Sequence, residues 1–293
     1  MRRLPPSPLT LARGETRIYN RRAPAPQPPG VAIQPSGRWA GRAPSGVPAL
    51  SLLLGAILAL VLAAPAAAQR SLVEELRAFA TRYHEDPAHL DALRDSLARA
   101  AKADPRPQNL VALAEVCFIW GDVRAATDDQ RLEAYDRGRE AAKRALEADP
   151  KNALAHFWYA TNTGRWAQTK GVVRSLFLLP TIKEEIQTVF SLAPDFTGVY
   201  SLAGNVYYEV PGLFGGDLEK AEEMFRRGLA LDPKFTGMRV GLGKVLIKEG
   251  RLPEARRELQ AVLDERAPSN PAAWTMKDTR EARQLLESIR DRS

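Results

Sequence analysis

Cysteine is almost absent from this chain of 293 residues, since Cys117 is the only one. A single cysteine excludes an intramolecular disulfide, and the sequence holds no CxxC pair and no Cys/His set with metal-site spacing. Cys117 lies in the apolar run LVALAEVCFIW, which predicts a buried side chain that behaves as a small hydrophobic residue. We therefore expect no metal and no cofactor.

Histidine is also scarce, and the motifs of common enzymes are missing. His84 and His89 are five positions apart, so they do not form the i, i+4 pair of a HExxH zinc site. No GxSxG nucleophile motif is present. His156 opens the aromatic run HFWYA, where it has either a packing role or a ligand contact. We expect a non-catalytic protein, and an enzyme that uses His156 stays open as an alternative.

Excess charge of one sign is confined to the start of the chain. The net charge of the chain is +7. Residues 1–48 hold eight arginines and one acid, which gives 8 − 1 = +7, so the charges of the remaining residues sum to zero. A nucleic-acid interface needs a basic excess on the folded part, so no nucleic-acid partner is expected. The Arg/Pro-rich residues 1–48 cannot bury a core, which predicts a disordered extension. The alternative is that residues 1–48 are not translated.

One long apolar run stands out at residues 49–64, ALSLLLGAILALVLAA. Arginines precede it, and the small-residue site AAAQ follows at 66–69. This order predicts a signal peptide at 49–68, cleaved after Ala68, and hence an exported protein. The uncharged stretch is also long enough to span a bilayer, so an uncleaved anchor formed by 49–68 is the alternative.

Strand-like alternation is lacking after Arg70, and the chain reads as successive amphipathic helices. Capping boxes at Ser71–Glu74 and Thr181–Glu184 predict two helix starts. Proline-containing junctions recur with steps of 45, 44, 39 and 35 residues, at Pro105, Pro150, Pro194, Pro233 and Pro268. A period near 34 with insertions is typical of helix-turn-helix repeats.

The last unit, TGMRVGLGKVLIKEGRLPEARRELQAVLDERAP, resembles the tetratricopeptide repeat (TPR) family. Leu242-Gly243 takes the Leu-Gly position, Gly250 the turn, and Ala255 a contact in the second helix. The small residues let the two helices pack closely. The resemblance implies an all-α fold, a TPR-like α-solenoid of antiparallel helix pairs over residues 69–293. We expect about four units, with a helical pair near 71–102 and a helix near 278–290 as caps.

The glycine-rich stretch PGLFGGDLEKAEEMF at 211–225 fits this repeat rather than a phosphate site. Aligning the unit from both ends leaves Pro211–Gly215 over, so PGLFG is predicted to be an insertion in the turn between two helices. Asp217 then caps the second helix, where its carboxylate would repel a phosphate.

Aromatic and apolar side chains exceed the needs of packing in and around the two insertions, 171–185 and 211–215. These apolar residues either form an exposed ledge or cover each other. We hypothesise that a partner or ligand contacts eight residues: His156, Trp158, Trp166, Phe177, Leu178, Tyr208, Leu213 and Phe214.

The order HFWYATNTGRWAQ, an apolar insertion and PGLFGGDLEKAEEMFRRGL resembles the TPR proteins grouped with the T-component of TRAP transporters. The resemblance covers about residues 70–290 and implies a periplasmic scaffold that binds a solute-binding subunit. It also implies a homo-oligomer with a pore or cleft and a small hydrophobic or organic ligand. Such proteins are often lipid-anchored, and this sequence lacks the lipobox cysteine. A general cell-envelope assembly scaffold is the alternative function.

Overall fold

Helices make up every regular element in the computed structural model, which describes residues 72–292. This confirms the predicted all-α class. The predictions for residues 1–48, for the signal peptide 49–68 and for a cap at Ser71 lie outside the described residues. No helix between residues 72 and 292 is long and apolar enough to cross a membrane.

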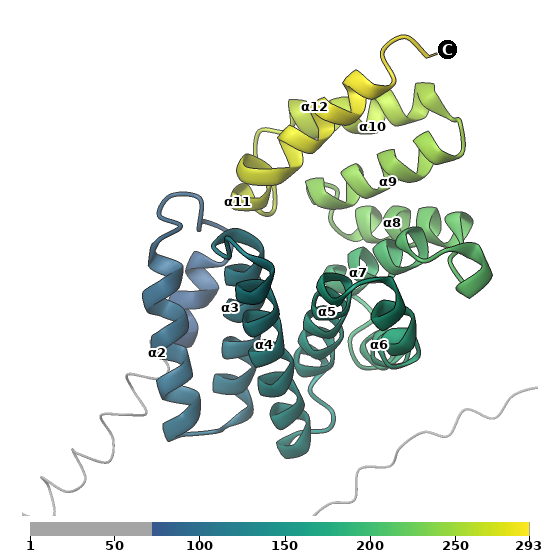
Figure 1. Ribbon diagram of the computed structural model, residues 1–293. Coiled ribbons are helices and arrows are strands. Elements are labelled where there is room, and N and C mark those ends of the chain that lie inside the picture. The colour runs from purple at the N-terminus through teal and green to yellow at the C-terminus, as the bar shows by residue number, and fades with distance from the viewer. Residues whose placement is uncertain (1–71, 293) are drawn as a thin grey trace, which may run out of the picture. The chain divides into compact units, whose positions relative to one another are not determined.

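The chain first forms a short helix at residues 72–79, followed by a series of longer ones (Figure 1). These are α2 His89–Ala103, α3 Pro107–Val123, α4 Asp128–Ala148, α5 Ala153–Lys170, α6 Val172–Leu192, α7 Thr197–Glu209, η1 Gly212–Phe214, α8 Leu218–Leu231, α9 Thr236–Lys248, α10 Leu252–Asp264, α11 Pro271–Ala273, η2 Trp274–Asp278 and α12 Thr279–Ser288.

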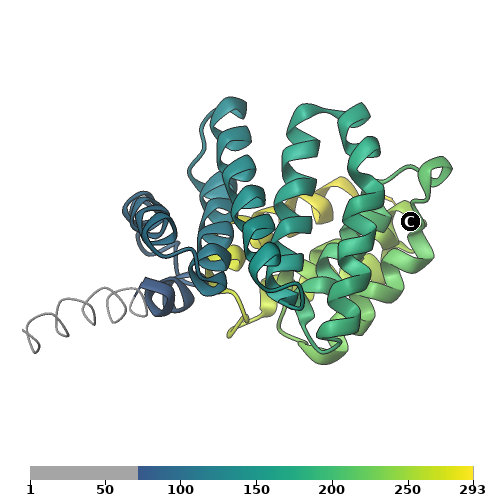
Figure 2. The same cartoon turned by 90° about the horizontal axis from the view of Figure 1, so that it is seen from below.

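Consecutive helices pack as antiparallel pairs, α3 with α4, α5 with α6, α7 with α8 and α9 with α10. The first helix of each pair also contacts the first helix of the next, and α9 contacts η2. The first helices therefore form an inner layer and the second helices an outer one (Figures 1 and 2). This is the α-solenoid of four units that the proline spacing predicts.

The turns between units share one hydrogen bond. A side chain on the first turn of α5, α7 and α9 reaches back to the carbonyl oxygen of the proline in the preceding turn. The spacing is six residues in each case: Tyr200 Oη to Pro194 at 2.8 Å, Arg239 Nη2 to Pro233 at 3.0 Å, and His156 Nε2 to Pro150 at 3.0 Å. The recurring proline therefore marks a recurring structural contact.

Glycines allow the inner and outer helices to approach each other closely. The Phe225 ring of α8 is fully buried between Gly204 of α7 and Gly241 of α9, and a Cβ at either glycine would lie within 2.6 Å of it. A Cβ at Gly243 would lie 2.7 Å from Leu259 Cδ2, which confirms the packing predicted for the last unit. Cys117 is fully buried, as expected, and burial raises the pKa of its thiol to about 12.

The insertion at PGLFG is confirmed. η1 lies in the turn between α7 and α8, and the Asp217 carboxylate accepts a hydrogen bond from the Lys220 backbone N–H at 3.1 Å. That backbone hydrogen bond and the Lys220 side chain hold the pKa of Asp217 below its usual value. A negatively charged N-cap is incompatible with an anion site at this helix.

The helix start predicted at Thr181 is wrong. α6 begins at Val172 and continues through Pro180, so Thr181 lies inside the helix. Proline removes one backbone hydrogen bond, but burial of Leu179 and Ile182 on the same helix favours continuation across it. The excess residues of this unit therefore lengthen α5 and α6 to 18 and 21 residues, against 13 and 14 in α7 and α8.

The C-terminal cap is longer than predicted. The Asn270 side chain accepts the Ala273 N–H at 2.9 Å and starts a helix seven residues before the expected position of 278. Helix α11 continues through the π-helical segment η2 into α12 without a break. Sequence periodicity misses this start because the π-helical segment shifts the apolar stripe by part of a turn.

Gly204 provides a test of the close packing. Gly204→Ala should lower the free energy of unfolding by about 1–3 kcal/mol, because the new methyl group overlaps the buried Phe225 ring. Gly164 of α5 is a matched control, since its nearest neighbour would be Ile182 Cδ1 at 3.8 Å. Gly164→Ala should leave stability unchanged or raise it by up to about 1 kcal/mol. Urea unfolding measures both, and equal effects would contradict the packing argument.

Glu115 of α3 gives the fold a pH dependence. Burial raises the pKa of its carboxyl to about 7, and Arg77 only partly opposes that rise. The folded-state pKa exceeds the ordinary value of 4.5, so the folded state holds this proton more tightly than the unfolded state. The free energy of unfolding should therefore fall as pH rises through the window from about 4.5 to about 7.

Glu115→Gln should remove that loss of unfolding free energy at high pH. We expect the variant to be more stable than the wild type by about 1–3 kcal/mol at pH 8, and to differ little from it at pH 4.5. Urea unfolding at the two pH values measures the difference. The exposed Glu147→Gln should show no such divergence, and a pH-independent effect of Glu115→Gln would refute the assignment.

Candidate functional site

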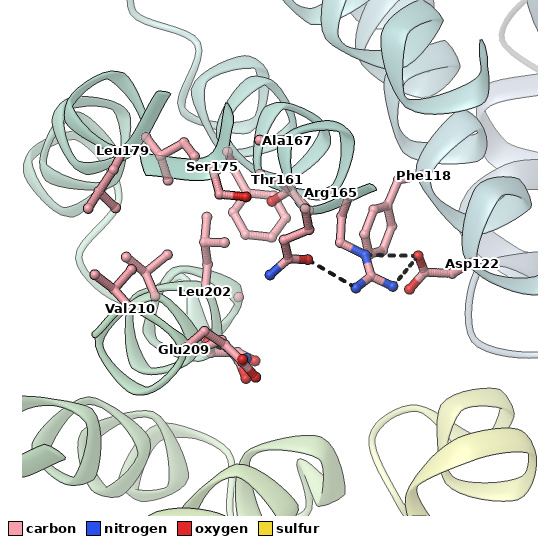
Figure 3. A pocket seen from close by; sticks show the side chains of 18 of the residues that line it. Phe118, Asp122, Thr161, Arg165, Ala167, Ser175, Leu179, Leu202, Glu209 and Val210 are labelled. Carbon is pink, nitrogen blue, oxygen red and sulfur yellow. Dashed lines mark hydrogen bonds and ion pairs between the residues drawn. The ribbon is translucent and has the colours of Figure 1, made fainter. Parts of the chain in front are cut away.

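A cleft of about 840 Å³ lies on the inner layer of helices. Its walls come from α3, α5, α6, α7 and α9 and from the segment around η2 (Figure 3). The inner helices α5 and α7 each contribute a stripe at helical spacing, such as Trp158, Thr161, Arg165 and Gln168 on α5. Residues three and four apart share one face of a helix, so these side chains all point the same way.

Part of the cleft lining is apolar. Phe118 of α3 and Trp158 of α5 lie with ring centroids 5.4 Å apart, and Phe157 packs edge-on to Trp158 at 4.9 Å. Leu179 of α6 and Leu202 of α7 line the wall nearby (Figure 3). An apolar body with a few polar groups is the usual composition of a binding cleft.

A charged cluster lies on the α3 and α5 wall. Arg165 Nη2 donates to Asp122 Oδ1 at 2.6 Å, and Tyr135 Oη of α4 donates to the same oxygen at 2.5 Å. Burial lowers the pKa of Arg165, but the Asp122 carboxylate more than offsets this and keeps it above its ordinary value. Burial and the same carboxylate raise the pKa of Tyr135. Figure 3 shows Arg165 held between Asp122 and a side-chain amide, Gln168 Oε1 at 3.4 Å.

Further charges lie on the wall formed by α9 and the C-terminal segment. Lys244 forms an ion pair with Glu281 of α12, and both line the cleft. Asp278 is buried and accepts a hydrogen bond from Thr236 Oγ1 at 2.7 Å. Burial raises the pKa of Asp278.

The N-terminal turn meets this C-terminal segment. The Ala272 N–H donates to the Thr81 carbonyl oxygen at 2.9 Å. Burial, and then the negative charge of Asp278, raise the pKa of Tyr83 to about 12. Two parts of the described chain that are remote in sequence, the turn at Thr81 and the segment at Ala272, are therefore in contact.

The hydroxyl of Thr161, a residue that lines the cleft, is itself buried. Thr161 is 8% exposed, and its Oγ1 is buried without a hydrogen-bond partner among the described residues. An unmade hydrogen bond at a buried group costs about 1–3 kcal/mol. Because this oxygen is not accessible from the cleft, it offers no contact to an occupant.

Among the sequence-predicted site residues, Trp158 lines the cleft, whereas His156 and Trp166 do not. Besides the Pro150 carbonyl, His156 contacts the Glu185 carboxylate through Nδ1, so its ring joins α5 to α6. Trp166 lies beside Arg139, whose guanidinium carbon is 4.6 Å from the ring centroid.

The other predicted residues lie on or near the two insertions. Phe177 is 73% exposed and Leu213 90%, so the alternative in which the two insertions bury each other does not occur. Phe214 is also exposed, and Leu178 is half-buried against the core. Tyr208 lies outside the cleft lining with Lys248 Nζ 4.8 Å from its ring centroid, and burial raises its pKa.

Sequence reasoning does not identify Asp122 and Arg165 as site residues, because their pairing joins residues 43 positions apart. Phe118 was missed because it lies in an apolar run that reads as core. The i, i+3, i+7 stripe on α5 was the available signal, once α5 is assigned as an inner helix.

The described helix pairs have the tetratricopeptide-repeat fold. Residues 215–278 match the tetratricopeptide-repeat family model. A solved TPR protein from Thermus thermophilus has the same fold, with a TM-score of 0.54 and 17% identity over 75% of this chain and 98% of that one.

Residues 72–214 match the family model described as regulator of microtubule dynamics protein 1-3. The chain is 30% identical to regulator of microtubule dynamics protein 3 of Xenopus laevis over 33% of its length and 22% of that protein. It is 26% identical to regulator of microtubule dynamics protein 2 of Homo sapiens over 38% of its length and 29% of that protein. The matched part thus spans less than a third of these relatives. The narrower resemblance to TRAP-associated TPR proteins stays a prediction.

Asp122 provides a test of the charged cluster. Asp122→Asn should lower the free energy of unfolding by about 1–2 kcal/mol, because it removes the charge that pairs with the partly buried Arg165. The exposed pair of Arg82 and Glu85, with N–O separation of 2.6 Å, supplies the control. Glu85→Gln should cause no measurable change in urea unfolding, and a loss as large as that of Asp122→Asn would count against a special role for the cleft pair.

Proposed function

We propose that this protein is a non-catalytic TPR interaction module that holds an extended segment of a protein partner in its inner cleft. The observation that carries this is the cleft itself, whose lining combines apolar side chains with two charged pairs. Apolar side chains of the partner supply affinity in such an arrangement, and polar groups set its register.

The inner helices favour a peptide over a folded surface. A cleft of about 840 Å³ accommodates a few side chains and not a domain. The exposed amide of Asn205 offers a hydrogen bond to a peptide backbone. The Asn205 amide already donates to the Ser201 carbonyl at 2.7 Å, which leaves its oxygen as an acceptor.

Similarity to other proteins suggests two different kinds of partner. The resemblance to TRAP-associated proteins implies a periplasmic solute-binding subunit and a homo-oligomer. The matches to regulators of microtubule dynamics imply a partner associated with microtubules. Co-sedimentation with microtubules and pull-down of a solute-binding subunit distinguish them, and a general envelope scaffold would do neither.

A small hydrophobic or organic ligand is the second candidate occupant. The observation that favours it is the cleft volume, which falls within the range of small-molecule sites. Native mass spectrometry of the purified full chain tests it, since a stoichiometric adduct of low mass would support the ligand over the peptide.

The peptide assignment is tested by selection from a random-peptide display library on the full chain. Asn205 is exposed in the cleft, so Asn205→Arg fills the cleft without disturbing the core. We expect this change to weaken selected peptides at least about tenfold, equal to about 1.4 kcal/mol, in fluorescence polarisation.

The control is Ala230→Arg, an exposed position on the outer helix α8 that does not line the cleft. It should leave peptide affinity unchanged, and both variants should keep the wild-type melting temperature. Peptides that bind Asn205→Arg as tightly as the wild type would place the binding surface elsewhere and overturn the proposal.

A further inference from the structure

The turn between α5 and α6 forms an unusual corner on the surface. Its residues, which we call the α5–α6 corner, are Trp166, Lys170, Val172, Val173, Arg174 and Phe177. Val172 is 71% exposed, Val173 84% and Phe177 73%, which is rare for three large apolar side chains within six positions. No described segment covers them.

Cations lie among these apolar side chains. The Arg174 guanidinium carbon is 5.8 Å from the ring centroids of both Trp166 and Phe177, and Lys170 Nζ is 5.7 Å from that of Trp166. Neither Lys170 nor Arg174 forms an ion pair with any described residue. The corner therefore carries two positive charges that no described carboxylate neutralises.

The surrounding sequence strengthens this positive field. Residues 150–183 contain five lysines and arginines and no acid, and of these five only Arg165 forms an ion pair with a described carboxylate, that of Asp122. Arg139 of α4, whose guanidinium carbon lies 4.6 Å from the Trp166 ring centroid, is paired with Asp136 at 2.8 Å. Outside residues 1–48 the chain is neutral in sum, so this local excess is a departure from the rest of the folded part.

We propose that the α5–α6 corner docks onto an anionic membrane surface, with Val172, Val173 and Phe177 entering the interfacial layer and Lys170 and Arg174 contacting lipid phosphates. Interfacial binding combines buried apolar area with attraction between basic side chains and anionic lipid, and aromatic rings with a polar environment suit the headgroup region. The corner presents apolar area, basic side chains and aromatic rings within residues 166–177.

A membrane fits the corner better than a protein does. Protein hot spots lie in well-packed, desolvated pockets, whereas these side chains project from a turn at Gly171, where nothing lies within 4 Å of an added Cβ. Apart from Val172, none of the six lines the cleft. The corner can therefore act independently of whatever the cleft holds.

The single cysteine makes a direct test practical. Cys117 is fully buried, so Val173→Cys in the full chain can be labelled selectively with a polarity-sensitive fluorophore. Vesicles of phosphatidylcholine with phosphatidylglycerol should shift the emission to the blue, and vesicles of phosphatidylcholine alone should not. A probe at the exposed Gln260→Cys on α10 should respond to neither.

Charge reversal then tests the cause. Lys170→Glu with Arg174→Glu should lower the vesicle affinity reported by the probe more than about tenfold, and Phe177→Ser should lower it while the charge is kept. Both changes are at exposed positions and should preserve the circular dichroism spectrum and the melting temperature. An emission shift that survives charge reversal, appears equally at Gln260→Cys, or is absent with anionic vesicles would overturn the proposal. The last result would leave a protein as the occupant of the corner.

Discussion

Close approach of helices at glycine is the constraint on which this solenoid depends. The Phe225 ring fills the space that side chains at Gly204 and Gly241 would otherwise occupy, and it joins two inner helices through one outer helix. The same arrangement recurs in the first units, where Gly121 lies against Tyr135. Because the inner helices are held at this short separation, their exposed stripes converge and form a continuous wall.

The cleft follows from that wall and from the C-terminal segment, which contributes Asn270, Lys277 and Glu281 to its lining. An open solenoid would present its inner face as a broad groove, whereas here the C-terminal segment meets the N-terminal turn. Buried groups support the contact, since Asp278 is held by Thr236 and lies close enough to Tyr83 to raise the pKa of that phenol. Four of the charges that line the cleft form two ion pairs, Arg165 with Asp122 and Lys244 with Glu281, whereas Glu209 and Lys277 form none with a described residue. The paired charges therefore orient an occupant more than they attract it from solution.

Much of the fold could be predicted because a repeat presents the same pattern several times, so a departure in one unit can be recognised by comparison with the others. The proline steps located the units, and the surplus at Pro211–Gly215 located an insertion that the structure confirms. Thr181 was assigned wrongly because a capping box is a local signal, while the continuation of α6 depends on burial of Leu179 against distant residues. The cleft was harder still. Asp122 and Arg165 meet only after α3 and α5 pack, and no local pattern carries that information.

The two surfaces differ in how their charges are used. In the cleft, Arg165 and Lys244 are each neutralised by a carboxylate from another helix, so that site contributes little long-range attraction. At the α5–α6 corner, Lys170 and Arg174 lack such partners among the described residues and stand beside exposed aromatic and aliphatic groups. Lengthening α5 and α6 beyond the helices of the next unit carries the corner outward. The added residues of α5 and α6 therefore set the α5–α6 corner, which we propose docks onto a membrane, apart from the cleft, which we propose holds a partner segment.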